Sequence, residues 1–357
     1  MADGAAGHLE TGGSSGAVWP IWGHETAVAS LALAIREGRV GHAYLMAGPS
    51  GIGKATLAQV FAQALCCDAT DRPDPGIPCG MCRSCRKISR GTHPDVRTWS
   101  LATQAATQKD GKHTMLNIET AREIRAATAL RPVEAPRRVI VVDDAETMQG
   151  AAQEALLKTL EEPPPAVVLL MLADDAELLM PTIRSRCLAV DLRPVSAGAI
   201  ARGLVNHGID PTLAAEVAAL AHGRPGWALA AAANPAMLTG EREAVAGALA
   251  WIAGTRYDRL ATAFKLGDGF SKRRAEIFTE LEIALAVWRD VLLAHCGLAS
   301  HLTYRREVER IVRLAESLDL ASIAHAVAAT QRCLADLDAN VRPRLALEGM
   351  VLQWPSP

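Results

Sequence analysis

Two groups of residues that could do chemistry lie close together in the first third of the chain. The first is the stretch Gly48-Pro-Ser-Gly-Ile-Gly-Lys54, which follows a short apolar run and precedes a helical pattern. Glycines at this spacing let backbone N–H groups turn toward phosphate oxygens, and the lysine that follows balances the charge of the outer phosphates. The stretch therefore predicts a phosphate-binding loop. The residues expected around a nucleotide are Gly48, Gly51, Gly53, Lys54, Ala55 and Thr56.

Parts of this site are unsuited to hydrolysis. The residue after the lysine normally offers a hydroxyl to Mg²⁺, but Ala55 has none, and Thr56 points about 100° away around the helix. A second apolar run, residues 139–142, ends in Asp143 and Asp144. Asp143 could hold Mg²⁺ through water, whereas Asp144 stands where hydrolysing enzymes usually carry a longer glutamate to activate the attacking water. ATP could therefore bind here without turnover.

The second group is a set of cysteines. Cys79, Cys82 and Cys85 are spaced C-x₂-C-x₂-C, and Cys66 and Cys67 lie just upstream. Thiolates this close in sequence can converge on one Zn²⁺, which takes four ligands in a tetrahedron. Either upstream cysteine could be the fourth ligand, because helical periodicity does not decide between them. A closed set of four thiolates predicts a structural zinc site, and a redox-active Cys-x-x-Cys pair is the competing interpretation.

The amino-acid composition limits which classes of protein the chain can belong to. The chain has 357 residues, of which 50% are hydrophobic and 4% aromatic, and this favours a mostly helical globular protein. The formal net charge of −2 gives none of the overall basic character that duplex-binding proteins usually have, so we expect contacts mainly with other proteins. No long apolar run is free of charges, so no membrane span is predicted. The scattering of the remaining cysteines favours a reducing cytoplasm.

Strand and helix patterns alternate along the chain up to residue 193. Buried strands are predicted at 42–47, 138–143 and 167–172, with helices at 21–36, 54–65, 117–130 and 153–160. This alternation predicts an α/β domain with a parallel sheet and helices on both faces, after which only helical spacing continues. The organisation we expect is a disordered tail at 1–18, a phosphate-loop domain at 19–193 with the zinc module at about 66–90, a small helical unit at 194–236 and a helical domain at 237–357.

Five motifs in this order resemble the clamp-loader subunits of bacterial DNA polymerase III, most closely those of the delta-prime type. They are the phosphate loop, the cysteine set, Gly91-Thr-His-Pro-Asp95, Ala155-Leu-Leu-Lys-Thr-Leu-Glu-Glu-Pro163 and Arg184-Ser-Arg-Cys187. The resemblance implies an AAA+ module, a helical lid at 194–236 and a collar domain at 237–357 through which subunits assemble. It also implies gamma/tau and delta subunits, the sliding clamp and primer-template DNA as partners within that complex. Matching the loop spacing to the family places the fourth zinc ligand at Cys67.

The resemblance also gives a role to the Ser-Arg-Cys motif. In the family this motif carries an arginine finger, which enters the ATP site of a neighbouring subunit, and here the finger would be Arg186. We expect Arg186 at an edge of the sheet, where a neighbour can dock. We also expect it to have little to bind within its own chain, because the local acids Asp174 and Asp175 precede its helix.

Several positions depart from the motor subunits of the family. Besides Ala55 and Asp144, Ala173 stands where motor subunits have a polar sensor of the γ-phosphate, and Gly226 stands where they have a second sensing arginine. Together these losses indicate a non-hydrolysing delta-prime-type subunit with little or no ATPase activity of its own. The alternatives are an active gamma/tau-type motor, in which Thr56 and Asp144 substitute, and a zinc-bearing phosphotransferase acting on a small substrate.

Overall fold

The computed structural model describes residues 19–107 and 114–356. The chain divides into two compact units, which are Met1–Ile200 with Gly223–Gly226, and Ala201–His222 with Trp227–Pro357. The disordered tail predicted at 1–18 lies outside the described residues. No helix within the described ranges is both long and apolar enough to cross a membrane.

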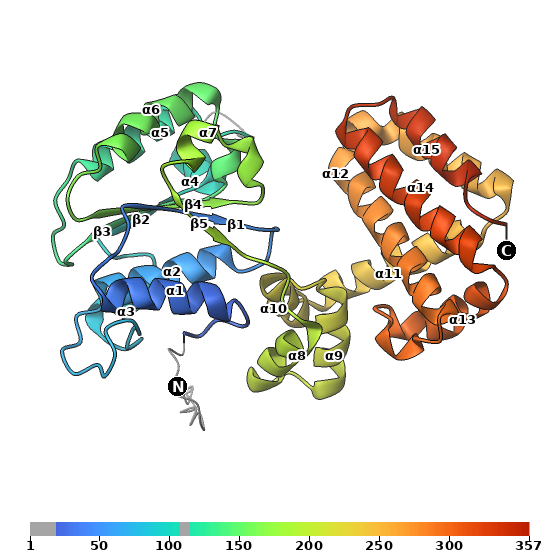
Figure 1. The fold of residues 1–357 in the computed structure, drawn as a ribbon, viewed down its shortest axis with the longest axis horizontal. Coiled ribbons are helices and arrows are strands. Elements are labelled where there is room, and N and C mark those ends of the chain that lie inside the picture. Colours follow the sequence, from blue (N-terminus) through green and yellow to red (C-terminus); the bar gives the residue numbers. More distant parts are fainter. Residues whose placement is uncertain (1–18, 108–113, 357) are drawn as a thin grey trace. The chain divides into compact units, whose positions relative to one another are not determined.

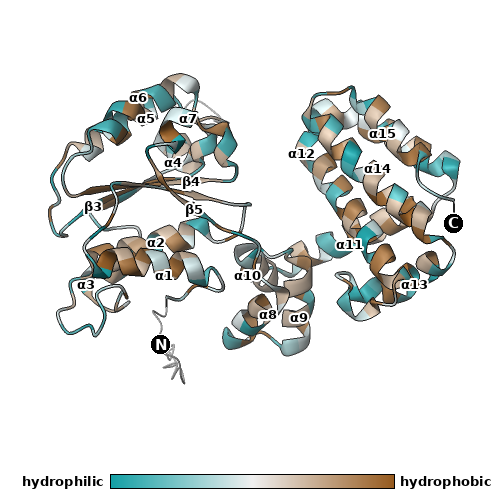
Figure 2. Ribbon diagram, in the orientation of Figure 1, coloured by the Kyte–Doolittle hydropathy of each residue, from teal (hydrophilic) through white to brown (hydrophobic). Residues whose placement is uncertain are grey.

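Within the described residues, the first unit is built on a five-stranded parallel sheet (Figure 1). The strands lie in the order β2 (Val96–Trp99), β3 (Arg138–Val142), β4 (Val167–Ala173), β1 (Ala43–Ala47) and β5 (Leu188–Asp191). Apart from Tyr44 in β1 and Arg138 at the start of β3, the three central strands consist of Val, Ile, Leu, Met and Ala, and they are the mostly brown strands of Figure 2. Such apolar runs are typical of parallel strands that are covered on both faces. The predicted parallel sheet is therefore confirmed.

Helices cover both faces of this sheet (Figure 1). One face carries α1 (Glu25–Arg36), α2 (Lys54–Cys66) and α3 (Arg83–Ser89). The other carries α4 (Leu101–Thr107), α5 (Ile118–Thr128), α6 (Gly150–Glu161) and α7 (Pro181–Arg184). A separate apolar core fills each layer: Phe61 and Leu170 lie in the first, and Ile124 and Leu156 in the second, all fully buried. Burial of this apolar surface holds the strand ends, and therefore the candidate site, in fixed positions.

The carboxyl ends of three neighbouring strands meet at one edge of the sheet. Gly48 follows β1, Asp143 follows β3 and Asp174 follows β4. The register aligns the ends of β1 and β4, because Ala47 pairs with Ala173. In open α/β sheets ligands bind at this edge, so the fold brings the phosphate loop and these acidic residues together.

The second unit consists of helices in the part of the chain that the structure describes. They are α9 (Pro211–Leu220), α11 (Pro235–Ala253), α12 (Arg256–His295), α13 (Val308–Glu316), α14 (Leu320–Asp338) and α15 (Pro343–Leu352), with α8 (Ala197–Asn206) and α10 (Pro225–Ala233) divided between the units. Trp288 on α12 is fully buried, and its ring packs edge-on against Trp354 at a centroid distance of 5.7 Å. The mostly helical carboxyl-terminal region agrees with the helical spacing in the sequence.

Candidate functional site: a phosphate loop and a cysteine cluster

The phosphate loop turns between the end of β1 and the start of α2. Gly48, Gly51 and Gly53 adopt φ angles of 151°, 76° and 110°, which glycine reaches without strain. A Cβ atom on Gly48 would lie 2.5 Å from the carbonyl oxygen of Leu192, so this position also needs glycine for space. Gly53 forms the amino-terminal cap of α2, whose free N–H groups are suited to binding an anion.

Lys54 is held by its own chain. The residue is only 8% exposed, and its Nζ donates to the carbonyl oxygens of Gly48 at 2.7 Å and Pro49 at 3.3 Å. The same Nζ forms an ion pair with the carboxylate of Asp174, directly after β4. Asp174 thus supplies the negative charge that an outer phosphate would bring to this lysine. Its role was not predicted, because the sequence does not show which strand ends are neighbours.

The other acidic residues at this edge differ in their surroundings. Asp143 is partly buried, and this burial, together with the charge of Asp144, raises the pKa of Asp143. Asp144 has a left-handed backbone with φ of 56°, and its Oδ2 accepts a hydrogen bond of 3.1 Å from the N–H of Leu101 at the start of α4. The Asp144 carboxylate therefore caps a helix and is already engaged, whereas Asp143 is the acid that could hold Mg²⁺ through water. Ala55 and Thr56 are both exposed in the first turn of α2.

The backbone of Gly226 contacts the phosphate loop. The N–H of Gly226 donates to the carbonyl oxygen of Gly51 at 2.8 Å. A Cβ atom at this position would lie 2.9 Å from the same oxygen, a separation that real Cβ atoms almost never have. Gly226 therefore lies directly on the loop, and the position expected for a second sensing arginine has no room for a side chain in this arrangement.

Arg186 has partners in its own chain, so the expectation that it has little to bind there is wrong. Its Nη2 lies 2.8 Å from Oε1 of Glu161 at the end of α6, and its Nη1 donates to the carbonyl oxygen of Thr182 at 2.8 Å. The side chain remains 35% exposed, and that of Glu161 remains 49% exposed. Arg186 precedes β5, which is an edge strand of the sheet.

The structure brings Cys67, Cys79, Cys82 and Cys85 together. Their four Sγ atoms lie within 4.8 Å of one another, and those of Cys67 and Cys82 are 3.9 Å apart. Tetrahedral zinc with Zn–S bonds of about 2.3 Å requires S–S separations of about 3.8 Å, so the cluster fits this metal. N–H groups of Cys82 and Cys85 donate to Sγ of Cys79 and Cys82, each at 3.3 Å, which orients two of the sulfurs.

Cys66 points elsewhere. Its Sγ lies 3.6 Å from the carbonyl oxygen of Arg137, and burial raises the pKa of its thiol to about 12. His93, in the motif Gly91-Thr-His-Pro-Asp95, also lies outside the group of converging thiols. Bound zinc would supply a rigid tetrahedral crosslink between the end of α2 and the start of α3. No open coordination position is left for catalysis when four thiolates bind.

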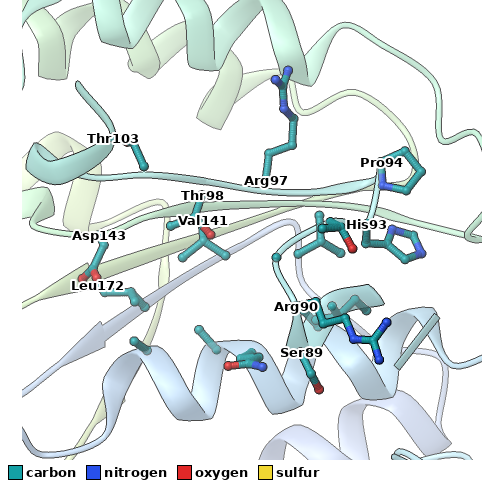
Figure 3. Close-up of a pocket in the computed structure, with 18 residues that line it drawn as sticks. Ser89, Arg90, His93, Pro94, Arg97, Thr98, Thr103, Val141, Asp143 and Leu172 are labelled. Atoms are coloured by element: carbon teal, nitrogen blue, oxygen red, sulfur yellow. The ribbon is translucent and has the colours of Figure 1, made fainter. Parts of the chain in front are cut away.

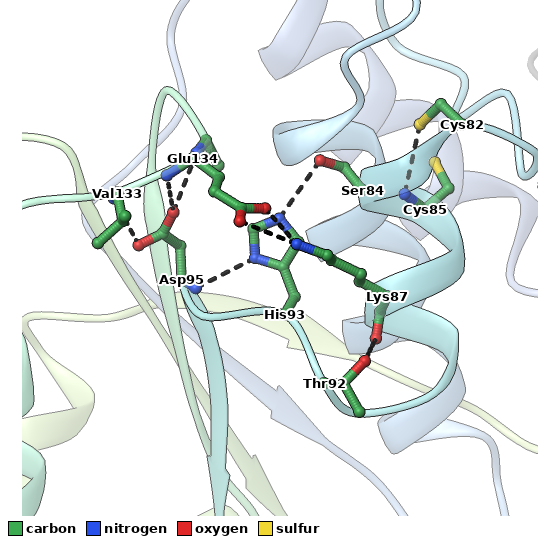
Figure 4. A network of polar contacts seen from close by, with 10 residues as sticks. Cys82, Ser84, Cys85, Lys87, Thr92, His93, Asp95, Val133 and Glu134 are labelled. Carbon is green, nitrogen blue, oxygen red and sulfur yellow. Dashed lines mark hydrogen bonds and ion pairs between the residues drawn. The ribbon is translucent and has the colours of Figure 1, made fainter.

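A polar network joins the cysteine cluster to the sheet (Figure 4). His93 accepts at Nδ1 from the N–H of Asp95 at 3.1 Å, which leaves the proton on Nε2, 3.3 Å from the hydroxyl oxygen of Ser84 beside Cys85. Asp95 is fully buried, and its carboxylate accepts three backbone N–H groups, from residues 133–135, at 2.7–2.9 Å. Burial alone would raise the pKa of Asp95, but these donors and Arg138 lower it. The Gly91–Asp95 motif is therefore a structural connector.

The parallel sheet, the phosphate loop after β1 and the acids after β3 and β4 define an α/β module of the P-loop type. Residues 23–196 match the family model described as DNA polymerase III, delta subunit. The delta-prime subunit of Bacillus subtilis is 25% identical over 89% of this chain and 92% of its own length. That of Pseudomonas aeruginosa is 34% identical over 41% of this chain and 42% of its own.

The gamma/tau subunit of Mycobacterium tuberculosis is 34% identical over 46% of this chain, and the match spans only 27% of that relative's length. The chain is thus similar to gamma/tau over about half of its length, and to delta-prime along most of its length. The family model and these relatives support a DNA polymerase III clamp-loader subunit of the kind that includes delta-prime and gamma/tau, in agreement with the sequence resemblance.

Proposed function

We propose that this chain is a non-hydrolysing, delta-prime-type subunit of the replicative clamp loader. The observation that carries the proposal is the ion pair between Lys54 and Asp174. A nucleotide would have to displace this carboxylate from the lysine and then place its own negative charge beside it, and like charges at such a distance repel strongly. The missing Mg²⁺ hydroxyl at Ala55 and the engaged carboxylate of Asp144 support the same conclusion and disfavour a motor subunit.

In this proposal the chain acts through its partners. The lid at 194–236 and the collar at 237–357 join it to gamma/tau and delta, and the complex places the sliding clamp on primer-template DNA. Arg186 supplies a trans arginine finger to the neighbouring ATP site. Its ion pair with Glu161 is exposed and therefore contributes only about 0–1 kcal/mol, so Arg186 can exchange this partner for a phosphate at little cost. Zinc on the cysteine cluster has a structural role.

Two measurements test the proposal. The purified chain should turn over ATP far more slowly than the roughly 1 s⁻¹ at the lower end of the usual enzyme range. A loader reconstituted with gamma/tau, delta and the Arg186→Ala chain should assemble normally but hydrolyse ATP more slowly when stimulated by clamp and DNA. Arg184→Ala is the matched control, because Arg184 belongs to the same motif and pairs with Glu177. Rapid turnover by the chain alone, or equal effects of the two substitutions, would contradict the proposal.

A further inference from the structure

The edge strand β2 has a cavity on each of its two faces. The first, of about 700 Å³, lies between β2 and α2, and its walls include Ala58, Arg90 and Val141. The second, of about 550 Å³, lies between β2 and α5, and its walls include Trp99 and Leu130. Arg97, Thr98 and Thr103 line both cavities. Figure 3 shows Thr98 and Val141 pointing from the sheet toward α2, whereas Arg97 points toward the opposite face.

The outer edge of β2 has free backbone groups between these cavities. The carbonyl oxygen of Asp95 accepts a hydrogen bond from the N–H of Val139 in β3, and that of Trp99 accepts one from the N–H of Asp143 just after β3, each at 2.8 Å. These two carbonyls therefore face inward, toward β3. Because peptide groups alternate in direction along a strand, the carbonyl of Val96 and both the N–H and the carbonyl of Thr98 face outward. Within residues 19–107 and 114–356, no group pairs with them. Such an edge is a template for a further strand.

Positive charge surrounds this edge. Arg90 lines the first cavity and Arg97 lines both, and Arg83 and Arg86 continue from Arg90 along α3 at helical spacing. All four arginines are exposed, and none forms an ion pair with a described residue. The surface is therefore cationic, although the chain as a whole carries a formal net charge of −2.

The acidic residues nearby do not cancel this charge. Glu134 is paired with Lys87 at 2.6 Å, and Asp143 lies at the far end of the first cavity. Glu123 lines the second cavity, where its Oε2 accepts from Nε1 of Trp99 at 3.4 Å. Each of these carboxylates is engaged or distant from Arg90, so the mouth of the first cavity stays positive.

We propose that an extended acidic segment of another protein adds to β2 as a further parallel or antiparallel strand. Main-chain hydrogen bonds to Val96 and Thr98 fix its path, and alternate side chains enter the two cavities, as in other cases of strand addition. Acidic side chains of the segment pair with Arg90 and Arg97. A single-stranded nucleic acid fits less well, because it needs exposed aromatic rings for stacking. The exposed aromatic side chains among the described residues, Tyr257 and Phe264, both lie in the second unit.

The test uses the full chain and three fluorescent probes followed by anisotropy. They are a short peptide with the repeat Asp-Asp-Val-Val, which places Asp on both faces of an added strand, the same peptide with Lys in place of Asp, and an oligothymidine of similar length. Of the three probes, the Asp peptide should bind most tightly, and added salt should weaken its binding. Reversal of both arginines, Arg90→Glu with Arg97→Glu, should weaken it at least about tenfold, since two charge-assisted contacts are lost. Arg202→Glu, at an exposed position in α8, is the matched control and should have no effect.

The pairing of strands is tested separately from the charge. Thr98→Pro removes only an outward N–H, which an edge strand tolerates, and should weaken binding about tenfold, whereas Thr98→Ala should not. Circular dichroism and metal content show whether each variant is folded. N-methylation of alternate residues in the Asp peptide removes the N–H groups that strand pairing needs, so it gives the same test without altering the chain. Equal binding of the Lys peptide, or full binding by Thr98→Pro and the methylated peptide, would overturn the proposal. Tighter, arginine-dependent binding of oligothymidine would assign the surface to nucleic acid instead.

Discussion

Replacement of Asp95 by asparagine would test whether this buried carboxylate holds the segment with the cysteine cluster on the sheet. In the structure it accepts three backbone N–H groups and lies 3.2 Å from Nη2 of Arg138, which is itself only 4% exposed. Asparagine keeps one acceptor oxygen but turns an NH₂ group toward backbone donors. It also leaves the Arg138 guanidinium without its buried counter-charge.

The expected magnitude follows from these contacts. Hydrogen bonds to a charged group contribute about 1.5–3 kcal/mol each, and removal of one partner of a buried ion pair costs about 3–5 kcal/mol. These contributions overlap, because they involve the same carboxylate, so they do not add. We therefore expect Asp95→Asn to lower the free energy of unfolding of the first unit by about 3–5 kcal/mol.

The assay is urea unfolding of the full chain followed by circular dichroism, together with hydrogen exchange of the β3 amides. Asp71→Asn is the matched control, because Asp71 is exposed in the same unit and a surface change of this kind usually alters stability by less than about 0.5 kcal/mol. A loss of less than about 1 kcal/mol for Asp95→Asn would refute the reasoning, because it would mean that the carboxylate is not the group that orders residues 133–135.

The pH dependence of this loss gives a second check. The folded state lowers the pKa of Asp95 below its ordinary value, so its carboxylate stabilises the fold above the unfolded pKa of about 3.9. That stabilisation disappears as the pH falls through the lower folded pKa. The difference in stability between the wild-type chain and Asp95→Asn should thus be nearly constant from about pH 5 to 8 and should shrink below about pH 4.

Three further predictions concern the cysteines, the phosphate loop and the second unit. Cys67→Ser should lose zinc, whereas Cys66→Ser should retain it, because only Cys67 lies within the cluster; elemental analysis of both variants decides. Gly226→Ala should displace the turn from the loop, because its Cβ would lie 2.9 Å from the Gly51 carbonyl oxygen, and faster limited proteolysis around residue 226 would reveal this. Arg259→Leu should lower the free energy of unfolding of the second unit by about 3 kcal/mol, because this buried guanidinium donates to the carbonyl oxygens of Ile252 and Pro355. A thermal unfolding scan measures the change, and an unchanged midpoint temperature would contradict this prediction.

The central strands could be predicted from sequence because their signal is local. β1, β3 and β4 are mainly apolar runs followed by Gly or Asp, and the structure reproduces all three to within one residue at each end. β2 was missed for a physical reason. It is a short edge strand in which Arg97 and Thr98 are exposed and only Trp99 is buried, so its sequence has no apolar run. Pairing with β3 makes it a strand, and that contact is not visible in the residues themselves.

The ionic partners in the site were not predictable in the same way. Arg186 was expected to be free because the acids nearest to it in sequence precede its helix, but its partner Glu161 ends a different helix, α6. Asp174 was noted only as one of those nearby acids, whereas it pairs with Lys54 at the start of α2. In both cases the partner lies on another element. Residue types and spacing indicate which groups can pair, and the packing of the elements decides which of them do.

The pairing of Lys54 also explains how a phosphate-loop sequence can persist in a chain that, as we propose, does not hydrolyse ATP. A lysine that is only 8% exposed would be costly without a counter-charge, and Asp174 provides one from within the chain. The glycines also have packing roles that do not depend on a nucleotide. Gly48 leaves no space for a side chain against Leu192, and the carbonyl oxygen of Gly51 accepts the N–H of Gly226. The loop is therefore a folded, internally neutralised element, and its motif indicates its shape more directly than it indicates hydrolysis.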